Sequence, residues 1–274
     1  MRIPNWYRID SAGLRYYAPW HFQASKLVDC GFSTRIGGVS KPPFDSLNLS
    51  LAVADDRDDV LTNRRLFASA LGFDPARIVV PDQVHSNVVR RVDEADAGSG
   101  AFDHRNAIPD TDALITDTPN LPLALHFADC VGVFFLDPLK RAIGVAHAGW
   151  RGTVESIVCE TIDAMSREFG TEPSTLLAAI CPAIERHCYE VGEDVAGRFF
   201  HIFPNENVIS PAGRGKWYVD LKMANRVMLK RAGVEDSNIA ISEHCTCCDF
   251  DEFFSYRRDA ATGRMGGWIS LRPL

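Results

Sequence analysis

The sequence lacks a long apolar run. Its most apolar stretch, residues 121–136, is interrupted by His126, Asp129 and Gly132. It is also shorter than the roughly 20 residues that a membrane-spanning helix needs. The first residues contain no apolar core of a signal peptide. These absences predict a cytoplasmic protein that does not work at a membrane.

Positive charge is scarce as well. The chain has 29 Lys and Arg against 36 Asp and Glu, which gives a formal net charge of −7. A protein that binds nucleic acid by neutralising phosphates has the opposite balance, so we expect no nucleic-acid partner. A few clustered arginines can still bind a small anion. The sequence also has no repeat and no low-complexity tract, which excludes a collagen and a disordered chain.

Cysteine and histidine are too few for the protein classes that depend on them. Eight cysteines in 274 residues do not make a disulfide scaffold. Eight histidines without a single H-x-H pair cannot build the three-copper cluster of a multicopper oxidase in the usual way. No H-x-E precedes a P-C-x-x-C, so the signature of the zinc base deaminases is absent.

What remains is an ordinary globular composition, with 46% hydrophobic and 24% charged residues. Short apolar runs predict buried strands, covered on both faces, at residues 121–128, 131–136, 142–148 and 176–180. Helical periodicity and closing glycines predict helices at residues 58–72, 153–170 and 221–233. The sequence therefore predicts a mixed α/β (α+β) fold: a single catalytic domain over residues 1–274, with a buried mixed sheet flanked by helices.

Three residues stand at the ends of predicted strands or of apolar segments: His85, Cys130 and His147. One thiolate and two imidazoles suit zinc, and three protein ligands leave a fourth position for water or substrate. Their separations match no local zinc-finger pattern, so a buried cysteine with two satisfied histidines stays an alternative. A further alternative is a hydrolase in which Cys130 is the nucleophile and one of the histidines is the base.

A second cluster is His244-Cys245-Thr246-Cys247-Cys248, in which Cys245 and Cys248 form a C-x-x-C. Such a pair can serve redox chemistry or metal binding. Cys181 and Cys188 are too widely spaced to complete a zinc ribbon. We therefore predict a structural cluster that is dispensable for chemistry and can form a disulfide on oxidation.

Arginines follow glycines and turns at three places, represented by Arg35, Arg151 and the Arg257-Arg258 pair. A guanidinium fork binds phosphate with two hydrogen bonds, and a helix N-terminus adds positive potential. Arg151 directly precedes a predicted helix. The alternative for each of them is a surface salt bridge.

Several longer motifs resemble one known family. They are, in order, GFSTRIGGVS with FDSLNLS, DQVHS, ADCVGVFFLDP, GVAHAGWRGT, CPAIERHCYEVG and FFSYRRDAATGRMG. Together they span residues 31–265 and resemble the polyphenol oxidase, or multicopper-oxidase-like laccase, family, whose members are regarded as zinc-dependent purine nucleoside phosphorylases. One departure is Cys181, which stands where the family usually has the glycine of G-P-A-I.

The resemblance implies a fold similar to that of bacterial toxin deamidases, which use a Cys–His pair. It implies one zinc held by His85, Cys130 and His147, with copper as a possible substitute. It also implies phosphorolysis of adenosine, inosine and methylthioadenosine to the free base and ribose 1-phosphate, accompanied by deamination of adenosine. The partners would be purine nucleosides and phosphate, and the chain would be a monomer or a small homo-oligomer.

The remaining role assignments follow from motif position and polarity. Cys130, His147 and Asp129 are the predicted catalytic residues. The predicted substrate contacts are Arg35, Asn48, Gln83, Arg151, Arg257 and Arg258. Three other functions stay open: a laccase-like copper oxidase, the Cys–His hydrolase, and a non-enzymatic partner in cell-wall or division processes.

Overall fold

The computed structural model describes residues 5–273. Its strands are β1 Trp6–Ser11, β2 Leu14–Pro19, β3 Val28–Ser33, β4 Val89–Arg91, β5 Ala113–Thr116, β6 Leu123–Phe127, β7 Val131–Asp137, β8 Ala142–Ala148, β9 Leu177–Ile180, β10 Glu190–Val191, β11 Ile209–Gly213, β12 Lys216–Val219, β13 Ile239–Ile241 and β14 Met265–Leu271. Its helices are α1 Trp20–Ser25, α2 Arg57–Leu71, α3 Trp150–Val154, α4 Ile157–Phe169, α5 Glu193–Ile202, α6 Leu221–Arg231 and α7 Tyr256–Asp259. The mixed α/β class predicted from the sequence is confirmed.

The six-stranded sheet has the order β13-β9-β7-β8-β5-β4. It is mixed, because β13 runs parallel to β9 and β4 parallel to β5, while the other neighbours are antiparallel. At its centre, the register of the β7–β8 pair sets Val131 opposite Ala148 and Gly132 opposite His147. The start of β7 therefore lies beside the end of β8.

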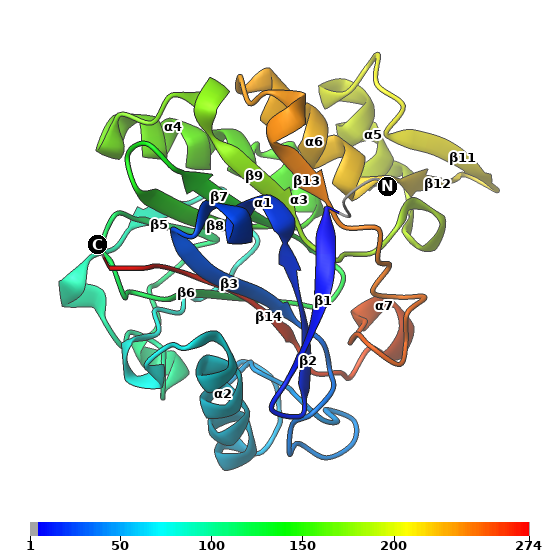
Figure 1. Ribbon diagram of the computed structural model, residues 1–274. Coiled ribbons are helices and arrows are strands. Elements are labelled where there is room, and N and C mark those ends of the chain that lie inside the picture. The colour runs from blue at the N-terminus through cyan, green and yellow to red at the C-terminus, as the bar shows by residue number, and fades with distance from the viewer. Residues whose placement is uncertain (1–4, 274) are drawn as a thin grey trace.

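A second, five-stranded sheet, ordered β1-β2-β3-β14-β6, packs against one face of the first (Figure 1). Alternation along β7 shows why both faces are apolar. Val133 and Phe135 belong to the core on the helix side, whereas Phe134 and Leu136 contribute to the core between the sheets. The strand is therefore apolar up to its last residue, Asp137, as the sequence predicts for a strand covered on both sides.

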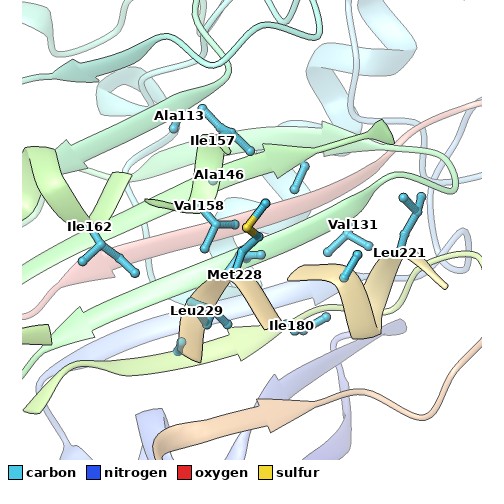
Figure 2. Packing of buried hydrophobic residues seen from close by; sticks show 14 of the residues in the cluster. Ala113, Val131, Ala146, Ile157, Val158, Ile162, Ile180, Leu221, Met228 and Leu229 are labelled. Carbon is cyan, nitrogen blue, oxygen red and sulfur yellow. The ribbon is translucent and has the colours of Figure 1, made fainter. Parts of the chain in front are cut away.

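Helices cover the outer faces of both sheets. On the six-stranded sheet, Val158 and Ile162 of α4 and Met228 of α6 pack over strand residues such as Val131 (Figure 2). On the five-stranded sheet, α2 places Phe67 against Trp268, with ring centroids 4.9 Å apart. The layers run helix, sheet, sheet, helix, and the small sheet β10-β12-β11 lies near α5 and α6 (Figure 1).

Two sequence predictions about these elements are wrong. The single buried sheet is two sheets, because β6 pairs with β14 and the chain crosses between sheets at residues 128–130 before entering β7. The helix predicted from Thr153 is divided into α3 and α4 by Ser156, which has a left-handed φ of 65°. Thr153 lies inside α3, where its hydroxyl donates to the carbonyl of Ala148.

The other two helices agree closely with prediction. Asp56 caps the start of α2 by accepting from the amides of Asp58 and Asp59, and Gly72 ends it in the left-handed conformation. Asp220 caps α6. No helix within residues 5–273 is both long and apolar enough to cross a bilayer.

Candidate functional site

Cys130 lies at the crossover between the two sheets, just before β7. The preceding residue, Asp129, has a φ of 84°, a left-handed conformation that is uncommon for residues other than glycine. Its buried carboxylate accepts hydrogen bonds from the Thr246 hydroxyl at 2.7 Å, the Ser255 hydroxyl at 3.0 Å and the Arg257 amide at 2.7 Å. These bonds fix the crossover and with it the position of the Cys130 thiol.

His147 reaches the same place from the end of β8. Its Nδ1 lies 2.8 Å from Oδ1 of Asp112, which is fully buried. A proton on Nδ1 donated to this carboxylate leaves the Nε2 lone pair free on the side of Cys130. The Asp–His pair thus fixes both the orientation and the tautomer of the ring.

His85 is held by the same carboxylate. Its backbone, at a left-handed φ of 64°, donates to Asp112 Oδ1 at 3.1 Å. The amide and hydroxyl of Ser86 donate to Oδ2 at 2.6 and 2.9 Å. Asp112 therefore organises both histidines, yet sequence reasoning missed it, because an acid just before a strand looks like an ordinary turn residue.

The donor atoms of His85, Cys130 and His147 all lie within 4.8 Å of one another, and Cys130 Sγ is 4.0 Å from His85 Nε2. Ligands bound to one zinc at about 2.0–2.3 Å lie about 3.3–3.8 Å apart, so these donors must move somewhat closer together to share one ion. The space between them is also kept free of side chain at Gly149, where a Cβ would lie 3.0 Å from Cys130 Sγ and 3.1 Å from His85. A thiolate, two imidazoles and a buried carboxylate behind one of them fit zinc with an open fourth position.

The protein's own charges favour the metal-binding form of the thiol. Burial raises the pKa of Cys130, but the adjacent His147 and His85 outweigh it and lower the pKa to about 6. Burial alone would lower the pKa of His147, whereas Cys130 and Asp112 raise it to about 9. Without metal, the pair is therefore a thiolate beside an imidazolium.

A cavity of about 440 Å³ opens beside these three residues. This is within the size range of small-molecule sites. Its wall comes from four regions of the chain: residues Ser50, Ala52, Val53 and Arg64; Val80, Pro81, Asp82, Gln83, His85 and His104; His126, Ala128, Cys130 and His147; and Tyr256 and Arg264.

Three groups in this wall were not singled out as substrate contacts from the sequence. Nε2 of His126 is buried and has no hydrogen-bond partner within residues 5–273. Burial and nearby cations such as Arg64 lower the pKa of His126 well below its usual value, so the ring is neutral. Arg264 and the 60% exposed Tyr256 complete this side. Only tertiary structure brings them together with His85.

Of the six predicted substrate contacts, Gln83 lines the cavity. Its side-chain amide already forms two hydrogen bonds with the backbone of His126: it donates to the carbonyl at 3.0 Å and accepts from the amide at 2.8 Å. Asn48 is buried behind the wall, where its side chain contacts Asp55 and accepts from the amide of Arg264 at 2.9 Å. Asn48 therefore supports the backbone at Arg264.

The four predicted phosphate arginines are not in the described lining of this cavity. Arg35 pairs with Asp45, and Arg151 lies over the ring of Trp150 with its guanidinium carbon 4.6 Å from the centroid. Arg257 donates to the carbonyls of Cys188 and Glu190. Arg258 donates to the carbonyls of Thr246, Cys247 and Phe253. Arg257 and Arg258 thus hold neighbouring loops, a role that the sequence alone does not distinguish from anion binding.

Asp129, predicted as catalytic, is placed behind Cys130. Both of its carboxylate oxygens are occupied by the hydrogen bonds described above. In this structure, Asp129 fixes the backbone between the two sheets and so positions the next residue, Cys130.

Comparison with known proteins gives consistent results. The chain is 42% identical over 245 residues to "Purine nucleoside phosphorylase YlmD" of Geobacillus stearothermophilus, covering 88% of this chain and 89% of that protein. It is 36% identical to "Adenosine deaminase RL5" from an unknown prokaryotic organism, covering 83% and 87%. The crystal structure of YlmD from Geobacillus stearothermophilus superposes with a TM-score of 0.91 at 39% identity, covering 97% and 99%.

A family model described as "Multi-copper polyphenol oxidoreductase laccase" matches residues 29–272. This match includes His85, Cys130 and His147, here called the three-donor cluster, and every residue of the cavity wall. The sequence resemblance is therefore confirmed over nearly the whole chain, and the protein belongs to the multi-copper polyphenol oxidoreductase laccase family.

Proposed function

We propose that this chain is a purine nucleoside phosphorylase that also deaminates adenosine. It would cleave adenosine, inosine and methylthioadenosine with phosphate, giving the free base and a ribose 1-phosphate. The observation that carries the proposal is the His85–Cys130–His147 cluster in the wall of a cavity of about 440 Å³. The relatives named for phosphorolysis and for adenosine deamination support the two activities.

His85, Cys130 and His147 would hold one zinc, which as a Lewis acid lowers the pKa of water into the neutral range. Copper can occupy a site of this N/S composition, because its affinity for such ligands is high. Asp112 keeps His147 in the binding tautomer, and Asp129 keeps Cys130 at the crossover. These two carboxylates are positioning residues.

Phosphorolysis requires an anion beside C1′ of the ribose. Arg264 is the cavity cation suited to this, since its side chain lines the wall and a guanidinium keeps its charge in proteins. Its Nη1 donates to the carbonyls of Thr262 and Gly263, so the anion would be bound by the other guanidinium nitrogens. The unpartnered Nε2 of neutral His126 can donate to, or accept from, a phosphate or ribose oxygen. Binding a polar ligand would thus satisfy a buried group that now lacks a partner.

The purine base needs an aromatic surface. Tyr256 is 60% exposed and lines the cavity, and the guanidinium of Arg264 lies 6.0 Å from its ring centroid. Stacking of a base on such a ring contributes about 1–3 kcal/mol. Tyr256 and Arg264 would therefore place base and phosphate on neighbouring parts of the wall.

One observation favours a second candidate, the Cys–His hydrolase. Without metal, Cys130 has its pKa lowered to about 6 beside a charged His147, as in a thiolate nucleophile with its base. The two candidates make opposite demands on the thiol, since a zinc ligand is occupied and a nucleophile must be free. Zinc that is required for turnover supports the phosphorylase, and an activity that increases when zinc is removed supports the hydrolase.

A laccase-like copper oxidase receives less support. Within residues 5–273, His and Cys side chains gather at two places, with two histidines at one and one at the other. A three-copper cluster needs many more imidazoles. Copper at the three-donor site would make phenol oxidation a trace side activity.

The deciding experiment follows adenosine by chromatography with and without phosphate. We expect adenine and ribose 1-phosphate only with phosphate, and inosine in both cases. Chelation should abolish deamination and zinc should restore it. Cys130→Ala should lose the zinc of the His85–Cys130–His147 site together with deamination and should stay folded. Full activity of metal-free protein in chelator would contradict the proposal.

A further inference from the structure

A second group of metal-binding side chains lies away from the cavity. The short 3-10 turn at Arg186–Cys188 faces the loop that contains the C-x-x-C motif. His187 Nε2 is 3.1 Å from Cys248 Sγ, and Cys188 Sγ is 3.3 Å from the same sulfur. With Cys245, the four donor atoms all lie within 4.8 Å of one another. The sequence pointed to no partner for the C-x-x-C motif, whereas the structure places His187 and Cys188 beside it.

The backbone holds the two segments in this arrangement. Ala183 and Cys245 form a parallel bridge, and the Thr246 amide donates to the Ala183 carbonyl at 3.2 Å. The amide of Glu185 points at Cys245 Sγ at 3.4 Å. A hydrogen bond from a backbone amide to a ligand sulfur helps to orient that ligand.

We propose that His187, Cys188, Cys245 and Cys248 bind a second, structural zinc ion in a closed Cys₃His site. Four such ligands with no open position are typical of structural zinc, and the C-x-x-C supplies two of them with the usual spacing. Tetrahedral ligands at about 2.0–2.3 Å lie about 3.5–3.8 Å apart. The observed separations therefore need only small shifts to meet around one ion.

A disulfide in place of zinc would not account for all four donor residues. A Cys188–Cys248 disulfide would need the two sulfurs, now 3.3 Å apart, at about 2.05 Å, and it would leave His187 and Cys245 without a role. The neighbouring Cys247 lies outside the four-donor group and packs against the core on the helix side. It provides a matched control one residue from a proposed ligand.

The position of the site gives the ion a specific structural effect. The same loop carries Thr246, whose hydroxyl donates to Asp129 at 2.7 Å, and Asp129 holds the crossover at Cys130. On the other segment, the Cys188 carbonyl accepts from Arg257, whose amide also donates to Asp129. A zinc that joins the two segments would therefore stabilise the hydrogen bonds around Asp129, which lie behind the His85–Cys130–His147 cluster, without touching the cavity.

The primary test counts zinc in the full-length protein purified under reducing conditions. We expect about two zinc per chain in the parent and in Cys247→Ser, and about one in Cys248→Ser and in His187→Ala. Cys130→Ala should retain one zinc, which separates this site from the proposed function. A Cys130→Ala protein that is folded but free of zinc would overturn the inference.

Zinc-edge X-ray absorption of Cys130→Ala identifies the ligands. We expect three sulfurs at about 2.3 Å and one nitrogen at about 2.0–2.1 Å. Chelation should lower the melting temperature of Cys130→Ala and leave that of the Cys130→Ala, Cys248→Ser double variant unchanged. A spectrum with one sulfur or none, or a Cys188–Cys248 disulfide found by mass spectrometry in place of zinc, would refute a Cys₃His site.

Discussion

At the scale of single residues, the cavity distinguishes Arg264 from the arginines singled out by motif position. We predict that Arg264→Ala raises the phosphate KM about ten- to a hundredfold, because a charge-assisted contact contributes about 1.5–3 kcal/mol. Adenosine deamination, which uses no anion, should fall much less. Arg151→Ala is the matched control, since Arg151 lies over Trp150 and should leave the phosphate KM within a few-fold of the parent. If the phosphate KM rises by the same factor in Arg264→Ala and Arg151→Ala, the phosphate site does not depend on Arg264.

Asp112 provides a second test at this scale. We predict that Asp112→Asn weakens zinc binding at the three-donor site about 10- to 100-fold, as loss of a carboxylate behind a histidine ligand commonly does. The physical reason is the loss of the charge that orients His147 and fixes its tautomer. Competition with a chromophoric chelator measures the affinity. Unchanged affinity in a folded variant would show that the ring needs no such partner.

The thiol of Cys130 should titrate far below an ordinary cysteine in the metal-free protein. Because its pKa is lowered to about 6, the thiolate fraction grows as pH rises through about 6 and is nearly complete by neutral pH. Burial raises the pKa of Cys30 and Cys181, which stay unreactive there. Iodoacetamide labelling read by mass spectrometry should show this inflection, and bound zinc should suppress it. An inflection near the ordinary thiol value would contradict the described His–Cys contact.

The residue scale also shows what sequence reasoning can reach. Donor type and position at strand ends drew attention to His85, Cys130 and His147, the family resemblance singled them out as a ligand set, and the structure gathers all three. Asp112, His126 and Arg264 were missed because their roles depend on what lies opposite them after folding. His187 and Cys188 were missed for the same reason, since the spacing of a ligand pair says nothing about which distant pair faces it.

At the scale of elements, the loop from β8 to α3 controls the space around the three-donor cluster. A Cβ at Gly149 would lie 3.0 Å from Cys130 Sγ, although its φ of −65° suits any residue. We predict that Gly149→Ala weakens zinc binding through crowding, whose cost is typically about 1–3 kcal/mol. Gly197→Ala is the control, because a Cβ there meets no atom within 4 Å. Both are measured by zinc competition and by urea unfolding, and equal zinc affinities would contradict the crowding argument.

Secondary structure was predicted correctly where the local hydrophobic pattern determines it. It was predicted wrongly where the outcome depends on residues far away in the sequence or on the backbone conformation of one residue. The runs that became β7 and β8 are apolar except for Asp137 and His147, so their burial was predictable, and both strands are buried at every position. Which sheet β6 joins depends on β14, far along the chain, and no local pattern encodes that pairing. The break at Ser156 was invisible because the apolar spacing continues through it.

At the scale of the whole molecule, the prediction of a single domain over residues 1–274 remains to be tested in solution. Trp6 and Trp268 are buried in or beside the five-stranded sheet, whereas Trp150 and Trp217 pack on the helix side of the other sheet. If both sheets unfold together, tryptophan fluorescence and far-ultraviolet circular dichroism should give one coincident urea transition in excess zinc. Two separated transitions would mean that the sheets are independent units.

The place of β14 in the five-stranded sheet has a consequence for synthesis. It lies between β3 and β6, and both of these strands leave the ribosome long before it does. Until β14 arrives, the nascent chain carries two open strand edges with apolar side chains, the kind of surface on which unfinished proteins aggregate. The order of translation therefore leaves this chain open to aggregation during synthesis until its last strand, β14, is made.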